Sequence, residues 1–387
     1  MNLSKTVILP GQTIGIIGGG QLGRMMALAA KPMGYRIAVL DPDPDSPCAQ
    51  IADQKIMGAY DDLDAIKQLA QVSDVITYEF ENVDSYTLAW LCENAHVPQG
   101  TTLLEISQDR IKEKAAIQSA GVQVAPYAVI TNIQDIYDNM KRLGFPAVLK
   151  TSRGGYDGKG QYVIRTEMDI IKASDLLHHG TCVLEKWIPF KKEISVILTG
   201  NTNGEVAVFP VAENIHLDNI LHQTVVPAMI NKEAEEKAVQ SAKQLARHFR
   251  LIGTLAVEMF LTEDDEIYIN ELAPRPHNSG HYTIEACVTS QFEQHIRAVC
   301  QMPFGSTELL KPALMVNILG EHQAPLLENW SMLPDWKVHF YGKKDPKPKR
   351  KMGHVTILCD SITQAIDEVA ISRIWENKAE NILEEKR

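Results

Sequence analysis

The feature that most constrains this chain is a glycine-rich segment between two short predicted strands. Residues 150–161 read KTSRGGYDGKGQ; they follow the apolar run Ala147–Leu149 and precede a second apolar run at 162–165. A hairpin turn needs one or two glycines for positive φ, and this segment has four. The extra glycines let backbone N–H groups approach phosphate oxygens, and Lys150 and Lys159 add positive charge. The spacing is not that of a Walker A motif, so an ordinary flexible hairpin remains the alternative.

Composition limits what the rest of the chain can be. The 387 residues are 45% hydrophobic and 22% charged, which predicts two or three packed domains and excludes wholesale disorder. A net charge of −11 disfavours non-specific binding to nucleic acid or to an anionic membrane. No apolar run is long enough to span a bilayer, and the first residues lack a signal-peptide core. The six cysteines are scattered without a C-x-x-C pair, so we expect reduced thiols in a cytoplasm.

The first hundred residues alternate predicted strands and helices. A buried strand, Thr13–Ile17, leads into Gly18–Gly23 and a helix, and the next strand ends at Asp41. This pattern fits the G-x-G-x-x-G dinucleotide fingerprint, although the same corner presents N–H groups to any anionic ligand. Residues 74–82 read as a further strand, and Glu79 and Glu81 lie at its carboxyl end, where ligands of a doubly wound sheet bind; a solvated loop is the alternative.

The sharpest chemical signal is a pair of carboxylates in two neighbouring apolar strands. The strands flank the acidic turn Thr262–Asp265, and a hairpin centred between Asp264 and Asp265 puts Glu258 opposite Glu271. Like charges directly opposite one another repel, and burying them is costly unless a cation binds both. Mg²⁺, with phosphate oxygens completing its shell, relieves that cost. In the alternative register, one of the two glutamates faces solvent.

Two later segments are dense in polar groups. Residues 273–281 read APRPHNSGH, and two prolines make this loop rigid beside the predicted metal, so it is suited to a small anion. Residues 342–351 read GKKDPKPKRK. A solvated basic loop is the plain interpretation, and a clamp for a phosphate monoester is the specific one. Nucleic acid is disfavoured because the remainder is acidic and no aromatics interleave the loop.

Weaker signals come from one helix and two strands. Arg110 and Lys114 share a face of a predicted helix, for which a solvated basic face is the plain interpretation. Residues 185–188 suit a purine edge and Glu193 suits a ribose hydroxyl, although singly each is an ordinary sheet residue.

Together these residues resemble a known family. Lys150, the loop, Glu193, Glu258 and Glu271 resemble those of the ATP-grasp carboxylate–amine ligases. Within that superfamily the chain is most similar to the N5-carboxyaminoimidazole ribonucleotide synthetases of purine biosynthesis. Four motifs carry this resemblance and span nearly the whole chain: Ile17–Gly23, Gly155–Gln161, Asn270–His281, and Tyr341–Lys343 with Arg350–His354.

The resemblance implies an α/β fold of three domains. These are an N-terminal doubly wound (Rossmann-like) domain at residues 1–104, an ATP-grasp domain at 105–308 with a lid at about 122–190, and a small C-terminal domain at 309–387. It also implies a homodimer that needs ATP and Mg²⁺ and binds no nucleic acid or membrane. The implied reaction joins bicarbonate to the amine of 5-aminoimidazole ribonucleotide through carboxyphosphate, with release of ADP and phosphate.

The resemblance also implies roles for single residues. Those for ATP are Arg110, Lys150, Gly155, Tyr156, Asp157, Gly158, Lys159, Gly160, Gln161, Glu185, Lys186, Trp187, Ile188, Glu193, His216, Asn270 and Glu271. Those for the ribonucleotide are Gln21, Leu22, Glu79, Tyr156, Asp157, Lys343 and Arg350. Glu258 and Glu271 hold Mg²⁺, Arg275 and His277 handle bicarbonate, and the catalytic set is Asp157, Arg275, His277 and Lys343.

Two rival interpretations stay open. A formate-using glycinamide ribonucleotide transformylase shares the ATP site, but Tyr156, Asp157 and the basic loop count against it. A NAD-dependent dehydrogenase explains the first glycine loop but leaves Glu258, Glu271 and the second glycine loop without a role.

Overall fold

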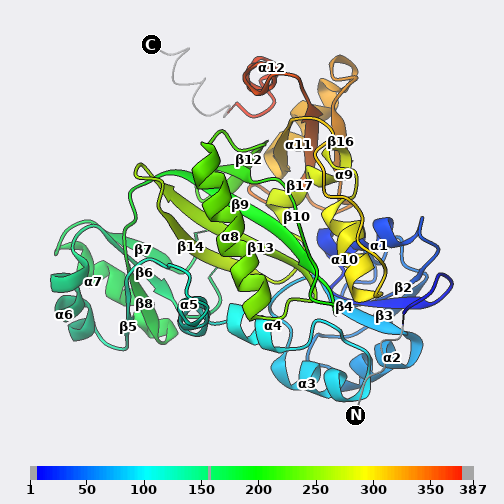
Figure 1. Cartoon of the computed structure of the whole chain (residues 1–387), viewed down its shortest axis with the longest axis horizontal. Helices are drawn as coiled ribbons and strands as arrows, with labels where there is room; N and C mark the ends of the chain where they lie inside the picture. Colours follow the sequence, from blue (N-terminus) through cyan, green and yellow to red (C-terminus); the bar gives the residue numbers. More distant parts are fainter. Residues whose placement is uncertain (1–6, 156–157, 377–387) are drawn as a thin grey trace.

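The computed structural model describes residues 7–155 and 158–376, whose strands form three sheets (Figure 1). A parallel sheet belongs to the N-terminal domain, a small antiparallel sheet to the lid, and a large antiparallel sheet to the centre of the molecule. In Figure 1 the lid lies at the left, the N-terminal domain at the lower right and the C-terminal segment at the top. Within the described ranges, no helix is both long and apolar enough to cross a membrane.

The N-terminal domain has the predicted doubly wound architecture, with strand order β3-β2-β1-β4. Strands β1, β2 and β4 are largely buried apolar runs because helices cover both faces: α1 packs on one face and α2 and α3 on the other. The chain passes to the other side of β1 when it enters β4, so the ends of β1 and β4 form a ligand crevice of the doubly wound type. The elements are β1 (Thr13–Ile17), α1 (Gln21–Ala30), β2 (Arg36–Asp41), β3 (Gln54–Met57), α2 (Leu63–Val72), β4 (Val75–Tyr78) and α3 (Ser85–Asn94).

The central sheet runs in the order β14-β13-β9-β11-β12-β15-β17-β16, with β10 beside β9. Helix α8 packs on β9 and β13 because Ala234, Ala238 and Ala242 recur every four residues and allow close approach. The Asn231 side chain caps the first turn of this helix. The elements of this part are α4 (Thr102–Ser107), α5 (Arg110–Ser119), β9 (Phe190–Gly200), β10 (Val206–Val208), β11 (Ala212–Leu217), β12 (Ile220–Val226), α8 (Lys232–His248), β13 (Gly253–Thr262), β14 (Ile267–Ala273) and α9 (Thr283–Ala286).

Helix α10 (Gln291–Val299) joins the N-terminal domain to the central sheet. Phe292 and Ile296 share one core with Met25 and Met26 of α1. On its other side, His295 accepts a hydrogen bond of 3.1 Å from the backbone N–H of Thr254 in β13. This helix is therefore held on both sides and is a rigid support for whatever contacts its first turn.

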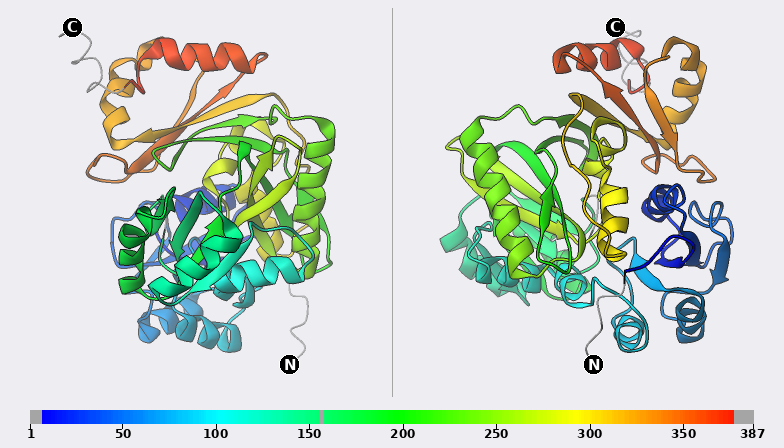
Figure 2. Two further views of the ribbon diagram at one scale, coloured as in Figure 1. Left: turned by 90° about the vertical axis from the view of Figure 1, so that its left-hand side faces the viewer. Right: turned by 45° about the vertical axis from the view of Figure 1, so that its right-hand side comes forward.

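The lid is a second antiparallel sheet, in the order β5-β8-β6-β7, covered by α6 and α7 (Figure 2). The β6–β7 hairpin predicted around the second glycine loop is present, with Lys150 opposite Gln161. Asn132 and Asp135 form a capping box that starts α6. The elements are β5 (Tyr127–Ile130), α6 (Ile133–Leu143), β6 (Ala147–Thr151), β7 (Gln161–Ile164), α7 (Asp169–Ala173) and β8 (Cys182–Lys186).

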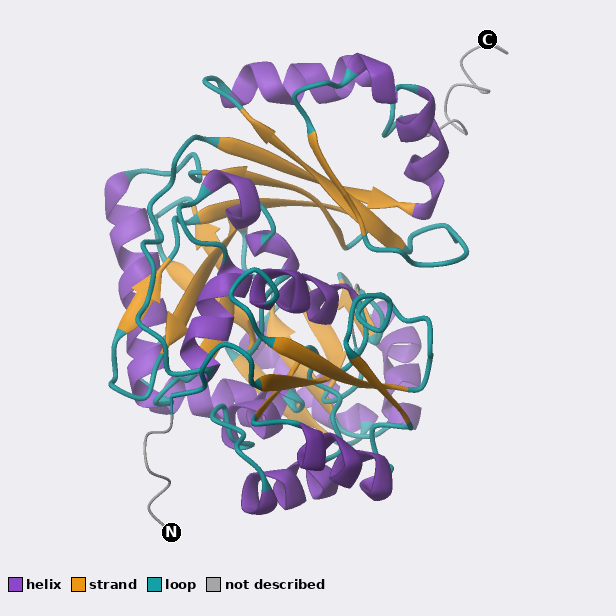
Figure 3. Cartoon of the chain, turned by 90° about the vertical axis from the view of Figure 1, so that its right-hand side faces the viewer, coloured by secondary structure: helices purple, strands orange, loops and turns teal. Residues whose placement is uncertain are grey.

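The C-terminal segment extends the central sheet, which the sequence did not predict. Strand β15 pairs with β12, and Val226 lies opposite Ala313, so one sheet passes from the centre of the molecule into the C-terminal domain (Figure 3). The elements are β15 (Ala313–Leu319), α11 (Gly320–Glu328), β16 (Lys337–Phe340), β17 (Lys351–Leu358) and α12 (Ile362–Ser372).

Three elements are shorter or more divided than their sequence patterns predict. The pattern of residues 74–82 predicts one strand, whereas β4 ends at Tyr78. Residues 206–216 also read as one strand, but the structure divides them into β10 and β11, because Pro210 lies between them and has no N–H for the ladder. The amphipathic pattern of residues 362–384 predicts a closing helix. Helix α12 ends at Ser372, where Arg373 adopts a left-handed conformation with φ of 54°, and residues 377–384 lie outside the described residues.

Candidate active site

A cavity of about 530 Å³ lies between the lid and the central sheet. Val148 and Val163 of the lid and Phe260 and Leu272 of the central sheet supply apolar walls that suit a flat base. Of the residues predicted to hold ATP, all the described ones except Gly160 line this cavity, and Glu258, Arg275 and His277 line it as well. Tyr156 and Asp157 lie outside the described residues.

A buried cluster of two lysines and one glutamate lies at this cavity. The Glu185 carboxylate is 3.1 Å from the Lys150 ammonium and 3.0 Å from the Lys114 ammonium. Burial alone would raise the pKa of Glu185, but the two ammonium groups lower it to about 2. Lys150 also donates to the Asn270 side chain over 3.4 Å, which brings β6 to β14. Two positive charges against one negative charge suit a phosphate.

The interpretation of the Arg110 and Lys114 helix face as solvated is wrong for Lys114. Its side chain is 1% exposed, because α5 directs it at Glu185 in the lid. Glu113, the preceding residue, is also buried and accepts a hydrogen bond of 2.7 Å from the Leu272 backbone. Burial, with the nearby Glu271 charge, raises the pKa of Glu113 to about 8. Neither role follows from helical spacing, since both depend on partners far along the chain.

The predicted cross-strand pair of carboxylates is confirmed, with Glu258 opposite Glu271. Burial, and then the Glu271 charge, raises the pKa of Glu258 to about 8. Glu271 also lies 3.7 Å from the Arg110 guanidinium. The described residues hold no group of three or more metal-ligating side chains. Two carboxylates without a third protein ligand fit Mg²⁺, which is commonly held by one or two carboxylates together with phosphate oxygens and water.

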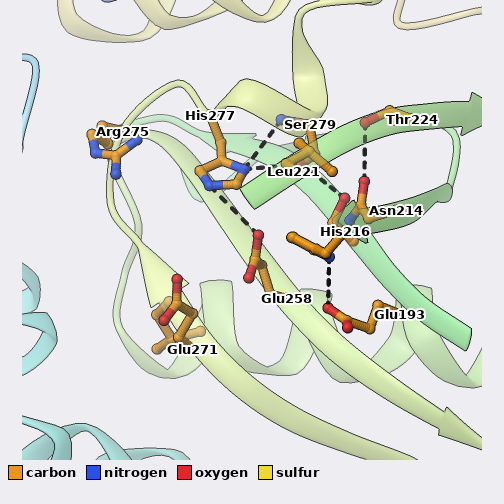
Figure 4. Close-up of polar contacts among 12 residues, drawn as sticks. Glu193, Asn214, His216, Leu221, Thr224, Glu258, Glu271, Arg275, His277 and Ser279 are labelled. Carbon is orange, nitrogen blue, oxygen red and sulfur yellow. Dashed lines mark hydrogen bonds and ion pairs between the residues drawn. The ribbon is translucent and has the colours of Figure 1, made fainter. Parts of the chain in front are cut away.

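Two more predicted ATP residues form a pair on neighbouring strands. The Glu193 carboxylate of β9 lies 2.9 Å from the His216 ring of β11 (Figure 4). Burial would lower the pKa of His216, but the hydrogen bond and charge of Glu193 raise it. Both side chains line the cavity, where a carboxylate–imidazole pair is suited to hydroxyl groups.

The loop after β14 directs Arg275 and His277 at the same cavity (Figure 4). The Arg275 guanidinium is 2.7 Å from the Glu81 carboxylate, so Glu81 forms an ion pair with this loop. The His277 ring lies 3.5 Å from Glu258 on one side and 2.9 Å from the Ser279 hydroxyl on the other. Burial, and then the Arg275 charge, holds the pKa of His277 well below its usual range, so the ring is neutral.

The first glycine loop is already filled by the protein's own carboxylates. Glu79 accepts hydrogen bonds from the backbone N–H groups of Gly20 and Gly23, the latter over 2.6 Å. Asp41 accepts from the Gly19 N–H over 2.6 Å and from the Tyr60 hydroxyl over 2.6 Å. A dinucleotide would have to displace both carboxylates from these donors. The dehydrogenase interpretation is therefore wrong, although its sequence fingerprint is present.

The remaining predicted ribonucleotide residues lie outside the cavity. Leu22 is in the core of the N-terminal domain, and Gln21 begins α1. Lys343 donates to the Lys351 backbone over 2.9 Å, and burial, with the nearby Arg350 charge, lowers the pKa of Lys343 to about 8. Arg350 is exposed and donates to backbone carbonyl groups of its own loop.

The basic loop lies against the N-terminal domain. Gln50 donates to the Gly342 carbonyl over 2.8 Å, and Lys344 pairs with Asp45 over 2.6 Å. Lys351, at the start of β17, lines the nucleotide-sized cavity and was not among the predicted residues. The C-terminal segment therefore contacts both the N-terminal domain and the cavity.

One cavity thus brings together a glycine hairpin lid, buried lysines and a cross-strand pair of carboxylates. This combination defines the ATP-grasp class of enzymes. Family models agree along the chain. "ATP-grasp domain" matches residues 115–292, "Ribonucleotide synthetase preATP-grasp domain" matches 11–108, and "Phosphoribosylaminoimidazole carboxylase C-terminal domain" matches 313–368.

Comparison with known relatives narrows the assignment from the ATP-grasp class to one family. The chain is 54% identical over 376 residues to the N5-carboxyaminoimidazole ribonucleotide synthase of Bacillus subtilis, covering 97% of this chain and 98% of that one. It is similar to the Staphylococcus aureus synthetase solved with ADP (TM-score 0.91, 44% identity, 95% and 98% of the two chains covered). It is also similar to the Aspergillus clavatus synthase solved with ADP and 5-aminoimidazole ribonucleotide (TM-score 0.88, 31% identity, 93% and 97% covered). The chain belongs to the N5-carboxyaminoimidazole ribonucleotide synthase family.

Proposed function

We propose that this chain carboxylates 5-aminoimidazole ribonucleotide with bicarbonate at the expense of ATP, giving N5-carboxyaminoimidazole ribonucleotide, ADP and phosphate in purine biosynthesis. The observation that carries the proposal is the Glu258–Glu271 pair, which shares one cavity with Lys150 and Glu185, while Lys114 pairs with Glu185 behind them. The similarity to a synthase that binds ADP and the same ribonucleotide supports it. We further propose a cytoplasmic homodimer.

The nucleotide is proposed to occupy the cavity under the lid. The apolar walls would hold the base, Glu193 and His216 the ribose, and the lysines and the hairpin amides the phosphates. Glu258 and Glu271 would hold Mg²⁺, which when bound supplies positive charge to the phosphates. Arg110 and Asn270 lie beside these groups, at Glu271 and Lys150 respectively.

Bicarbonate needs activation because hydroxide is a poor leaving group. An oxygen of bicarbonate attacks the γ-phosphorus, the bond to ADP breaks, and carboxyphosphate forms. The amine nitrogen then attacks the carboxyl carbon, the bond to phosphate breaks, and the amine loses a proton. Arg275 and the neutral His277 would hold the anion with hydrogen bonds, and a closed lid would exclude water from the reactive intermediate. Asp157 is proposed to orient the amine or to accept its proton.

The ribonucleotide is proposed to lie between the N-terminal domain and the basic loop. Gln21, Leu22 and Glu79 would contribute from the first side, and Tyr156 and Asp157 from the lid. Lys343 and Arg350 would hold the 5′-phosphate. The docking of the basic loop on Gln50 and Asp45 supports this arrangement, because it brings the two sides together.

The decisive experiment is ATP hydrolysis by the purified protein with and without bicarbonate and each candidate amine. We expect ADP release that depends on 5-aminoimidazole ribonucleotide, together with incorporation of labelled bicarbonate into the product. Release that depends instead on glycinamide ribonucleotide and formate would contradict the proposal. Titration with NAD is the control, and no binding is expected because Glu79 and Asp41 occupy the first glycine loop.

A further inference from the structure

The side chain of Gln291 holds the backbone of His277 by two hydrogen bonds. The His277 N–H donates to the Gln291 carboxamide oxygen over 2.9 Å, and the carboxamide N–H₂ donates to the His277 carbonyl over 2.7 Å. This is the exchange of bonds that a residue makes with its partner in an antiparallel ladder. Gln291 is fully buried and is the first residue of α10. A single side chain therefore takes the place of a neighbouring strand.

The loop after His277 is shaped around this carboxamide. A Cβ on Gly280 would come within 2.5 Å of the Gln291 oxygen, so the loop closes on the amide only with glycine at this position. The Thr283 hydroxyl accepts from the Gln291 backbone N–H over 2.9 Å and donates to the Gly280 carbonyl over 2.7 Å. The His281 ring lies 3.4 Å from the carboxamide nitrogen. Together these contacts fasten the loop to α10.

We infer that Gln291 is a positioning residue, which fixes His277 and Arg275 at the bicarbonate end of the cavity. The His277 ring lies between Glu258 and Ser279 (Figure 4), and the His277 backbone is hydrogen-bonded to Gln291 of α10. Helix α10 is itself held by the N-terminal core and by β13. The inference rests on the proposed function, since it gives the loop the role of holding the anion.

The same helix provides a matched control. Gln294, three residues further along α10, is also fully buried and holds Gly305 in the same way: the Gly305 N–H donates to the carboxamide oxygen over 3.0 Å, and the carboxamide nitrogen donates to the Gly305 carbonyl over 3.0 Å. Gly305 does not line the cavity. The two glutamines thus share helix, burial and hydrogen-bond pattern, and differ in the loop that they hold.

The first test compares Gln291→Met with Gln294→Met, which keep the chain length and remove both hydrogen bonds. Each variant should lose a similar amount of thermal stability. Gln291→Met should lower kcat by about 10- to 100-fold, the cost of misplacing reacting groups by about 1 Å, and raise the KM for bicarbonate. Its dissociation constant for ADP should stay unchanged, because the nucleotide residues lie on other elements. Equal activity in the two variants would overturn the inference.

The second test uses Gln291→Glu, whose neutral carboxyl group can accept from the His277 N–H and donate to its carbonyl. The ionised form cannot donate, so the ratio of variant to wild-type kcat should rise as the pH falls from 8 to 5.5. Among the described residues, the titratable ones that contact the Gln291 carboxamide are His277, through its backbone, and His281, through its ring. Burial holds the pKa of each imidazole well below its usual range. Gln291→Met should show no such rise, and a flat ratio for Gln291→Glu would also contradict the inference.

Hydrogen exchange separates this inference from the proposed function. The peptide that spans residues 275–281 should exchange faster in Gln291→Met than in Gln294→Met, whatever the substrate is. If wild type fails to turn over ATP with bicarbonate, the proposed function fails, but this comparison still measures how strongly Gln291 holds the His277 loop. Unchanged exchange in Gln291→Met refutes the positioning role even in an active enzyme.

Discussion

At Glu258, burial and the facing charge of Glu271 act in the same direction on the carboxyl group. Its pKa rises to about 8 from the ordinary carboxyl value of 4.5. Between these pH values the folded protein holds a proton that the unfolded chain releases, so this group makes the folded state less stable as the pH rises through that window. A divalent cation reverses the preference, because it favours both ionised carboxylates.

The first prediction follows for Glu258→Gln. In this variant, the stability that wild type loses through Glu258 as the pH rises should be retained. Without nucleotide at pH 8, we therefore expect the variant to be more stable than wild type by roughly 0.2–1 kcal/mol, the scale of cross-strand pairs. Turnover should be abolished, since one of two proposed Mg²⁺ ligands is lost. Thermal unfolding at pH 5 and pH 8, together with ATP turnover, measures both effects.

Glu266→Gln is the control, because Glu266 is exposed near the tip of the same hairpin. It should change neither the pH dependence nor the activity. Full turnover by Glu258→Gln at ordinary Mg²⁺ concentrations would refute the metal assignment.

The pairing of Glu258 with Glu271 could be predicted from the sequence, but the hairpin geometry behind it could not. The strands near the turn are centred on Asp264, since Leu261 lies opposite Ile267. That register alone would put Asn270 opposite Glu258. A bulge at Asn270 shifts the pairing by one residue and brings in Glu271. The bulged Asn270 contacts Lys150 of the lid, a long-range partner that the sequence pattern does not reveal.

At the scale of elements, the lid hairpin touches the turn between β11 and β12. Gly158 has a φ of 78°, and a Cβ at this position would lie 2.6 Å from the Asn219 Cβ. Asn219 itself has a φ of 63° and accepts a hydrogen bond from Gln161 over 3.5 Å. The local sequence pattern predicted the hairpin around these glycines. It did not predict this contact, because the partner turn lies about 60 residues further along the chain.

The second prediction compares Gly158→Ala with Gly154→Ala. Both glycines have a φ of 78°, so each substitution brings a similar backbone strain of about 1–2 kcal/mol. A Cβ at Gly154 meets nothing within 4 Å, whereas one at Gly158 meets Asn219. Gly158→Ala should therefore raise the KM for ATP by about tenfold more than Gly154→Ala, because the lid no longer closes on that turn. Equal KM values in steady-state kinetics would show that this contact does not contribute to nucleotide binding.

At the scale of the whole molecule, the proposed ribonucleotide site is assembled from three parts of the chain. The domain boundaries at residues 1–104, 105–308 and 309–387 stay predictions. Across the second boundary, the pairing of β12 with β15 makes the sheet continuous. The sequence could not predict this pairing, because nearly ninety residues separate Val226 from Ala313 and each strand pattern is local. Sheet continuity and the docked basic loop together fix Lys343 relative to the N-terminal domain.

The last prediction concerns Arg350→Ala. An arginine fork suits the two oxygens of a phosphate monoester, and each charge-assisted hydrogen bond contributes about 1.5–3 kcal/mol, so the KM for the ribonucleotide should rise by roughly ten- to a hundredfold. The KM for ATP should barely change, since Arg350 does not line the nucleotide cavity. Lys347→Ala, an exposed lysine of the same loop, is the control. The effect should shrink for a substrate analogue without the phosphate, and a rise in the KM for ATP alone would show that the loop does not clamp the ribonucleotide.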